Sequence, residues 1–250
     1  MIDDNIKTLL RHLADKYETA DFLPSDPSSF MHRVSGDGNQ EAMAFVASCL
    51  SYGSRRQFFP KIQFMLDASG GDMHQWLLQG AWRDSIADTG QCYYRLYTCH
   101  DMRVLLQAYQ DMLATYGSMK EYVRQNARTG IEAVGHICHH FASHGASKVV
   151  PKNTASACKR VCMFLRWMVR SGSPVDLGLW ADIIGRDSLI MPLDTHVMQE
   201  ALRLGLISSR TASMGTALRL TEAMREVFGD DPLRGDFALF GLGVDANSKT

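Results

Sequence analysis

Hydrophobic residues recur along most of the chain at the three- to four-residue spacing of helices that bury one face. Residues 6–17 show this spacing first, and acidic or amide side chains just before them can cap the first turn. Residues 101–116 repeat the spacing, and Gly117 follows as the kind of residue that often ends a helix. The same pattern predicts helices over residues 58–66, 73–82, 119–125 and 131–141, and Ser118 is placed to cap the third of them.

Residues 40–51 differ from these amphipathic segments because they are apolar almost all round, which predicts a helix buried in the middle of the fold. Residues 21–39 contain prolines and glycines and predict an extended connection. Residues 85–98 fit either a strand or a helical turn. The sequence shows no repeat and no sustained strand alternation, so the predicted fold class is all-α.

The composition predicts a cytoplasmic protein with no membrane partner. A chain of 250 residues with 46% hydrophobic content can bury a substantial core. No apolar run is long enough to cross a bilayer, and the N-terminus lacks the hydrophobic core of a signal peptide. Six cysteines show no CxxC spacing, so we expect them to stay reduced.

Positive charge is concentrated in one interval, although the formal net charge of the whole chain is only -1. Between Glu132 and Asp176 there is no acidic residue, whereas six Lys and Arg residues and four histidines fall there. This interval predicts an anion-binding surface, with an ordinary solvated face as the alternative. Two adjacent arginines after Gly53 form a candidate phosphate clamp, with plain surface charges as the alternative. The candidate nucleic-acid contacts are Arg55, Arg56, Lys148, Lys152, Asn153 and Arg160.

Asp194 follows the apolar run that stops at Pro192 and precedes an amphipathic helix that runs to Gly205. This position predicts an N-cap, in which the carboxylate accepts hydrogen bonds from the first free amides of the helix. The same carboxylate can present a fixed negative charge to whatever lies in front of the helix. A plain cap is the alternative to a functional role.

Lys159 lies near the start of another predicted helix, whose buried stripe is Val161, Phe164, Leu165 and Met168. We expect Lys159, Cys162, Arg166 and Arg170 to lie along another side. The positive end of the helix dipole and the nearby Arg160 and Lys152 favour a neutral lysine, which nucleophilic catalysis requires. A plain surface lysine is the alternative.

His136, His139 and His140 invite a metal-site interpretation. On one helix only His136 and one of the other two share a face, and no carboxylate in the segment completes a ligand set. We therefore expect no metal and no other cofactor.

Three segments resemble the helix-hairpin-helix DNA glycosylases. Leu193-Asp194-Thr195-His196-Val197, followed by Arg-Leu-Gly, is similar to the signature of the endonuclease III relatives, in which the Asp is catalytic. The segment from Lys159 to Arg166 is similar to the helix that bears the Schiff-base lysine in archaeal and thermophile 8-oxoguanine glycosylases. Residues 236–240 fit a closing helix of this type. The whole chain also resembles a bacterial family of uncharacterised proteins.

The resemblance implies a single helical unit over residues 1–250 with two lobes, one over about 40–145 and one that joins 1–39 to 146–250. It implies base excision from damaged duplex DNA by a monomer, with an oxidised purine as a candidate base. In that reaction Lys159 attacks the sugar, Asp194 stabilises its developing positive charge, and β-elimination at the abasic sugar can follow. His196 would be a further DNA contact. The candidate base-pocket residues are Trp180, Asp236 and Phe237, with core packing as the alternative for Trp180.

The chain departs from the family pattern at three places. The hairpin of most glycosylases reads Leu-Pro-Gly-Val-Gly, whereas residues 150–154 contain no glycine, so Lys152 or Asn153 would have to replace its phosphate contacts. The last cysteine is Cys162, which excludes the C-terminal iron-sulfur cluster of many endonuclease III relatives. Residues 171–188 form an insertion relative to endonuclease III.

Two other functions remain as alternatives. One is a non-catalytic DNA- or RNA-binding module that keeps the fold. The other is a metal-dependent hydrolase that uses His136, His139, His196 and nearby acids.

Overall fold

The protein is predominantly helical, which confirms the all-α prediction. The computed structural model describes residues 2–247, and within them the strands are limited to one two-stranded antiparallel sheet. No helix in this range is both long enough and apolar enough to span a membrane.

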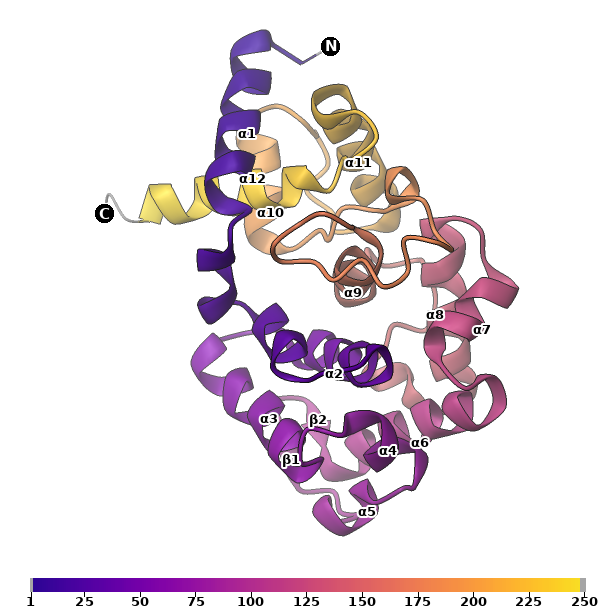
Figure 1. Ribbon diagram of the computed structural model, residues 1–250. Helices are drawn as coiled ribbons and strands as arrows, with labels where there is room; N and C mark the ends of the chain where they lie inside the picture. The colour runs from indigo at the N-terminus through magenta and orange to yellow at the C-terminus, as the bar shows by residue number, and fades with distance from the viewer. Residues whose placement is uncertain (1, 248–250) are drawn as a thin grey trace. The chain divides into compact units, whose positions relative to one another are not determined.

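The chain divides into two compact units (Figure 1). Unit 1 consists of the residues up to Pro24, Thr129–Ile131 and the residues from Thr154 onward; unit 2 consists of Ser25–Arg128 and Glu132–Asn153. From the sequence we placed residues 25–39 and 146–153 in the lobe that carries Asp194, whereas the contacts assign them to unit 2.

Unit 2 contains most of the predicted amphipathic helices. Their bounds are α2 (Asp37–Leu50), α3 (Arg55–Ala68), α4 (Met73–Leu78), α5 (Trp82–Ser85), α6 (Cys99–Tyr116), α7 (Met119–Asn126) and α8 (Gly130–Ser143), which starts in unit 1. The caps predicted for α6 and α7 are confirmed, because Gly117 ends α6 and the Ser118 side chain accepts a hydrogen bond from the amide of Glu121.

Helix α2 is the buried helix that its apolar sequence predicted, with every residue from 41 to 50 buried. The Phe45 ring stacks on Phe141 at 4.7 Å between centroids and meets Tyr109 edge-on at 5.3 Å. The one buried charge on this helix, Glu41, accepts hydrogen bonds from the amides of Met119 and Lys120. A buried carboxylate is tolerated there because it satisfies free amides at the positive end of α7.

The segment 85–98, which the sequence left open, contains a short hairpin of β1 (Cys92–Tyr94) and β2 (Tyr97–Thr98). Arg95 has a left-handed backbone with φ 50°, which turns the chain tightly between the strands. The hydroxyl of Tyr94 donates to the carbonyl of Tyr52, and the hydroxyl of Tyr52 donates back to the carbonyl of Tyr94. These reciprocal contacts hold the hairpin against the end of α2.

The predicted extended connection over 21–39 is largely wrong, because most of it is helical. It contains the 3-10 helices η1 (Ala20–Ser25) and η2 (Pro27–Arg33), and α2 already begins at Asp37. Proline at the first position of η2 and the Asp26 cap, which accepts from the amide of Ser28, suit a helix start.

Unit 1 contains α1 (Asp4–Tyr17), α9 (Lys159–Val169), η4 (Arg186–Ser188), α10 (Thr195–Arg203), α11 (Met214–Phe228) and α12 (Arg234–Asn247). Helix α12 packs against α1 and α10. Phe22, which follows α1, meets the rings of Phe237 and Phe240 edge-on at 5.3 and 5.1 Å. Helix α9 is buried from Val161 to Val169, so other elements of unit 1 surround it. Side chains at either end of α9 can therefore contact those elements.

Candidate functional site

Asp194 is the N-cap of α10, as its sequence position predicted. Its carboxylate accepts a hydrogen bond of 2.8 Å from the amide of Val197, and its backbone carbonyl accepts from Met198. Gly205 follows the helix with φ 68°, which is the left-handed residue expected there. The buried residues Pro192 and Leu193 anchor the chain just before the cap. The side chain of Asp194 is therefore held in place while remaining 36% exposed.

Lys159 is the first residue of α9, and the fold brings it to Asp194. The Lys159 Nζ atom lies 3.7 Å from Oδ2 of Asp194, and the lysine side chain is 30% exposed. A pair at this distance is in electrostatic contact, and its partial exposure lets another molecule reach both groups. The two residues that the sequence analysis selected as catalytic thus form one half-open site.

Cys158, directly before Lys159, has a left-handed backbone with φ 46° and is buried. Such a conformation costs a non-glycine residue on the order of 1–3 kcal/mol and persists only where the surroundings hold it. Here it sets the direction in which α9 starts, and with it the position of Lys159. No sequence signal distinguishes this cysteine from the other buried ones.

Asp236 brings a second carboxylate to the site. It lies in the first turn of α12, its side chain is 13% exposed, and it accepts a hydrogen bond from Nη1 of Arg166. Burial raises the pKa of Asp236 to about 6; the charge of Arg166 opposes this rise, Asp194 adds to it, and Lys159 lowers it. Asp236 therefore shares an electrostatic environment with both residues of the half-open site.

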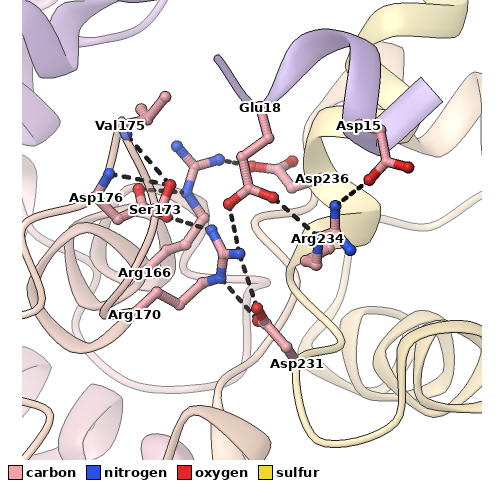
Figure 2. A network of polar contacts seen from close by, with 10 residues as sticks. All are labelled: Asp15, Glu18, Arg166, Arg170, Ser173, Val175, Asp176, Asp231, Arg234 and Asp236. Carbon is pink, nitrogen blue, oxygen red and sulfur yellow. Dashed lines mark hydrogen bonds and ion pairs between the residues drawn. The ribbon is translucent and has the colours of Figure 1, made fainter. Parts of the chain in front are cut away.

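The far end of α9 carries a cluster of ion pairs around two buried arginines, Arg166 and Arg170, which we call the arginine cluster (Figure 2). Arg166 bonds Asp176 through Nε at 3.2 Å, and Arg170 also donates to Asp176. Arg170 makes a bidentate contact with Asp231 at 2.7 and 2.8 Å. Glu18 bridges to a third arginine, because it contacts Arg170 at 2.7 Å and Arg234 at 3.0 Å. The members are Asp15, Glu18, Arg166, Arg170, Asp176, Asp231, Arg234 and Asp236.

The arginine cluster corrects one prediction from the acid-free interval. We expected Arg166 and Arg170 to lie on a side of α9 away from the buried stripe and to contribute to an anion-binding surface. Both are buried, and acids from outside the interval already neutralise them. An interval without acids in sequence is therefore not without acids in space.

The predicted nucleic-acid contacts of unit 2 differ in whether their side chains are exposed or already paired with an acid. Arg55 and Arg56 are exposed in the first turn of α3. Lys152 and Asn153 are exposed in the turn that follows η3 (Ala146–Lys148). Lys148, by contrast, contacts Asp101 at 2.6 Å. In unit 1, His196 is exposed on α10, and Arg160 is partly buried on α9.

The sequence analysis missed Arg95 and Leu96 at the tip of the hairpin. The Arg95 guanidinium lies over the Tyr52 ring at 5.5 Å and fills the space beside Gly53, where a side chain would collide with it. Leu96 is 75% exposed, more than any other large hydrophobic side chain among the described residues. Residues 51–66 and 91–100 contain no acid, which was the available signal. Arg55, Arg56, Arg95 and Leu96 together are called the hairpin surface below.

Two of the candidate base-pocket residues are packed in the core. Trp180 is fully buried and meets Phe164 edge-on at 5.2 Å. Phe237 is fully buried beneath the guanidinium of Arg166, which lies 4.5 Å from its ring centroid. Both side chains are therefore packed in the core and do not face solvent.

The histidines of α8 do not converge on one point. His136 is partly buried, His139 is exposed, and Nε2 of the buried His140 lies 2.8 Å from the carbonyl oxygen of Ala108. Over the part of the chain that the structure describes, no group of three or more His, Cys, Asp or Glu side chains is arranged to hold a metal ion.

Comparisons with known proteins give one match. The family described as "Protein of unknown function (DUF2400)" matches residues 26–245, which is most of the chain. No curated protein and no solved structure matches the chain. The chain therefore belongs to the DUF2400 family, and the half-open pair of Lys159 and Asp194 lies within the matched range.

Proposed function

We propose that this protein is a DNA glycosylase that removes a damaged base and can cleave the resulting abasic site. The observation that carries the proposal is the contact of 3.7 Å between Lys159 Nζ and Asp194 Oδ2. An amine and a carboxylate at this distance, both partly exposed, are the groups that nucleophilic excision of a base requires.

Each group has a defined chemical task in this proposal. The neutral amine of Lys159 attacks the anomeric carbon of a flipped nucleotide, and the bond to the base breaks as the base leaves with its electron pair. Positive charge develops on the sugar, and the carboxylate of Asp194 stabilises it. The N-cap bond to Val197 holds this carboxylate in place, so little reorganisation is needed during the reaction.

The resemblance to helix-hairpin-helix glycosylases supports this reading at the motif around Asp194, which starts a helix as in that superfamily. The glycine-free segment 150–154 follows a 3-10 helix, so phosphate contacts in this region would come from Lys152 and Asn153. Damaged duplex DNA is the proposed partner, and the chemistry assigned to Lys159 and Asp194 needs no cofactor.

The hairpin surface supports a nucleic-acid partner independently of Lys159. Three exposed arginines and an exposed leucine project from segments that contain no acid. Arginine binds phosphate oxygens through two donors at once, and apolar side chains contact bases where they are unstacked. A surface of this kind suits a bound duplex better than a basic or purely apolar partner.

Borohydride trapping tests the proposed function. Incubation of the protein with a duplex that contains an abasic site should give a covalent adduct when borohydride reduces the imine, and Lys159→Gln should abolish the adduct. Lys152→Gln is the matched control and should keep it.

An adduct that persists unchanged in Lys159→Gln would assign the nucleophile to another amine. Salt-sensitive binding of the duplex without any adduct would instead support the non-catalytic nucleic-acid-binding alternative.

A further inference from the structure

The chain segments just before the two residues of the half-open site are both attached to α11. Ser156, three residues before the site lysine, forms an antiparallel backbone bridge with Ser213, the N-cap residue of α11. Met191, three residues before the site aspartate, donates its backbone amide to the side-chain hydroxyl of Thr221 at 3.0 Å. Helix α11 is therefore a common support for both sides of the site.

The hydroxyl of Thr221 is a buried acceptor that is already oriented. It donates its own hydrogen to the carbonyl of Ala217, one turn earlier in α11, at 2.8 Å, which leaves its oxygen free to accept the Met191 amide. Thr221 is 3% exposed and Met191 is fully buried. Without this acceptor the amide would be unsatisfied in the core, and the chain around it would have to move to find another partner.

The segment that joins Met191 to Asp194 is short and stiff. Pro192 and Leu193 are both buried, and the ring of Pro192 fixes its φ. A shift of Met191 is therefore passed on to the Asp194 carboxylate. Because a displacement of about 1 Å at a reacting group can slow a reaction about a hundredfold, this bond bears on chemistry as well as on packing.

We propose that Thr221 is a positioning residue that holds Asp194 opposite Lys159, an inference that rests on the proposed function. The N-cap bond to Val197 orients the carboxylate relative to α10, and the bond from Met191 to Thr221 sets where α10 begins. Together the two bonds keep the carboxylate 3.7 Å from the amine. Thr221 acts through Asp194 and is not itself a reacting group.

The test is the rate of adduct formation with an abasic-site duplex under borohydride. The protonated Lys159 amine and the aldehyde of the opened sugar combine and lose water, which gives a positively charged imine that the Asp194 carboxylate stabilises. Thr221→Val keeps the shape of the side chain but removes the acceptor, and should slow this rate by a factor of about ten to a hundred. Thr221→Ser restores a hydroxyl and should recover most of the wild-type rate.

A double-mutant cycle tests whether the effect passes through Asp194. An Asp194→Asn protein lacks the charge that is to be positioned, so adding Thr221→Val to it should change the rate by less than about twofold. A core that is loosened without any link to Asp194 would instead slow both backgrounds by the same factor.

Thr216→Val is the matched structural control. Thr216 is also a buried threonine of α11, but its hydroxyl contacts Ser213 and Arg219, each at 3.1 Å. We expect this variant to lower the melting temperature, as Thr221→Val does, while its rate stays within about twofold of wild type. If Thr221→Val does not fold, Thr221→Ser and Thr221→Ala replace it, because these two variants differ only in the hydroxyl.

The failures of the two proposals are distinguishable. A wild-type protein that forms no adduct overturns the proposed function and this inference with it. A wild-type protein that forms the adduct while Thr221→Val matches its rate overturns only the role of Thr221. A loss of equal size in Thr216→Val or in the Asp194→Asn background would also overturn that role, as would a Thr221→Ser protein as slow as Thr221→Val.

Discussion

The two ends of α9 carry positive side chains in opposite electrostatic states. At the C-terminal end, the arginine cluster joins three guanidinium groups to five carboxylates, and Arg166 and Arg170 are buried within it (Figure 2). At the N-terminal end, the Lys159 ammonium faces Asp194 at 3.7 Å and remains partly exposed. One helix thus presents a closed charge network and an open ion pair.

The difference indicates which end can act on another molecule. A buried guanidinium that already has several carboxylate partners is neutralised and shielded from a ligand, and removing a partner leaves an uncompensated charge. An ion pair in partial contact with water contributes little to stability, so it can be broken during a reaction at small cost. We therefore expect substitutions in the arginine cluster to change stability and substitutions at Lys159 or Asp194 to change chemistry.

The largest effect should come from breaking the closed end. Arg170→Ala leaves Asp231 and part of the charge on Asp176 and Glu18 without a partner, and should lower the free energy of unfolding by about 3–5 kcal/mol. Urea unfolding measures this change. Arg186→Ala, which removes an exposed contact of 2.6 Å with Asp230, is the control and should barely move the urea midpoint. Equal midpoints for the two variants would remove the distinction between closed and open pairs.

Substitution of Asp194 at the open end of α9 should change the reaction rate strongly and the stability little. Asn caps a helix about as well as Asp, so Asp194→Asn should change the free energy of unfolding by no more than about 1 kcal/mol. The charge is lost, however, so release of a damaged base should slow by a factor of about a hundred or more while DNA binding survives. Asp194→Ala should lose stability as well because the cap disappears. Wild-type rates in Asp194→Asn would reduce this residue to a structural cap.

A smaller effect is expected on DNA binding by unit 2, where exposed arginines and ion-paired cations should contribute differently to the salt dependence. Arg56→Ala or Arg95→Ala should reduce the slope of log affinity against log salt by about one per phosphate contact, measured on a lesion-free duplex. Lys148→Ala should change the slope less because Lys148 already contacts Asp101 at 2.6 Å. Arg124→Ala, whose charge is paired with Glu121 at 3.2 Å, is the control. Identical slopes in all these variants would argue against the hairpin surface as a phosphate contact.

The sequence by itself determined the local features of this protein. The spacing of apolar residues predicted α1, α6 and α8, and the uninterrupted apolar character of residues 40–51 predicted the burial of α2. The caps at Ser118 and Asp194 followed from side chains that bond amides only three residues away. These features were predictable because the residues that cause them lie within one or two helical turns of one another.

The tertiary structure determined which charged side chains are neutralised by a partner. Nothing near Arg170 in sequence shows that Glu18 and Asp231 surround it, and the acid-free interval therefore suggested an exposed patch where the fold has buried ion pairs. Packing likewise holds the left-handed backbones of Arg95 and Cys158. Asp194 was predicted as a cap from its own neighbours, but its contact with Lys159 exists only because α9 and α10 bring their N-terminal ends together. Electrostatic partners act across space, so the position of a charge along the chain does not determine whether it is neutralised or left open to a ligand.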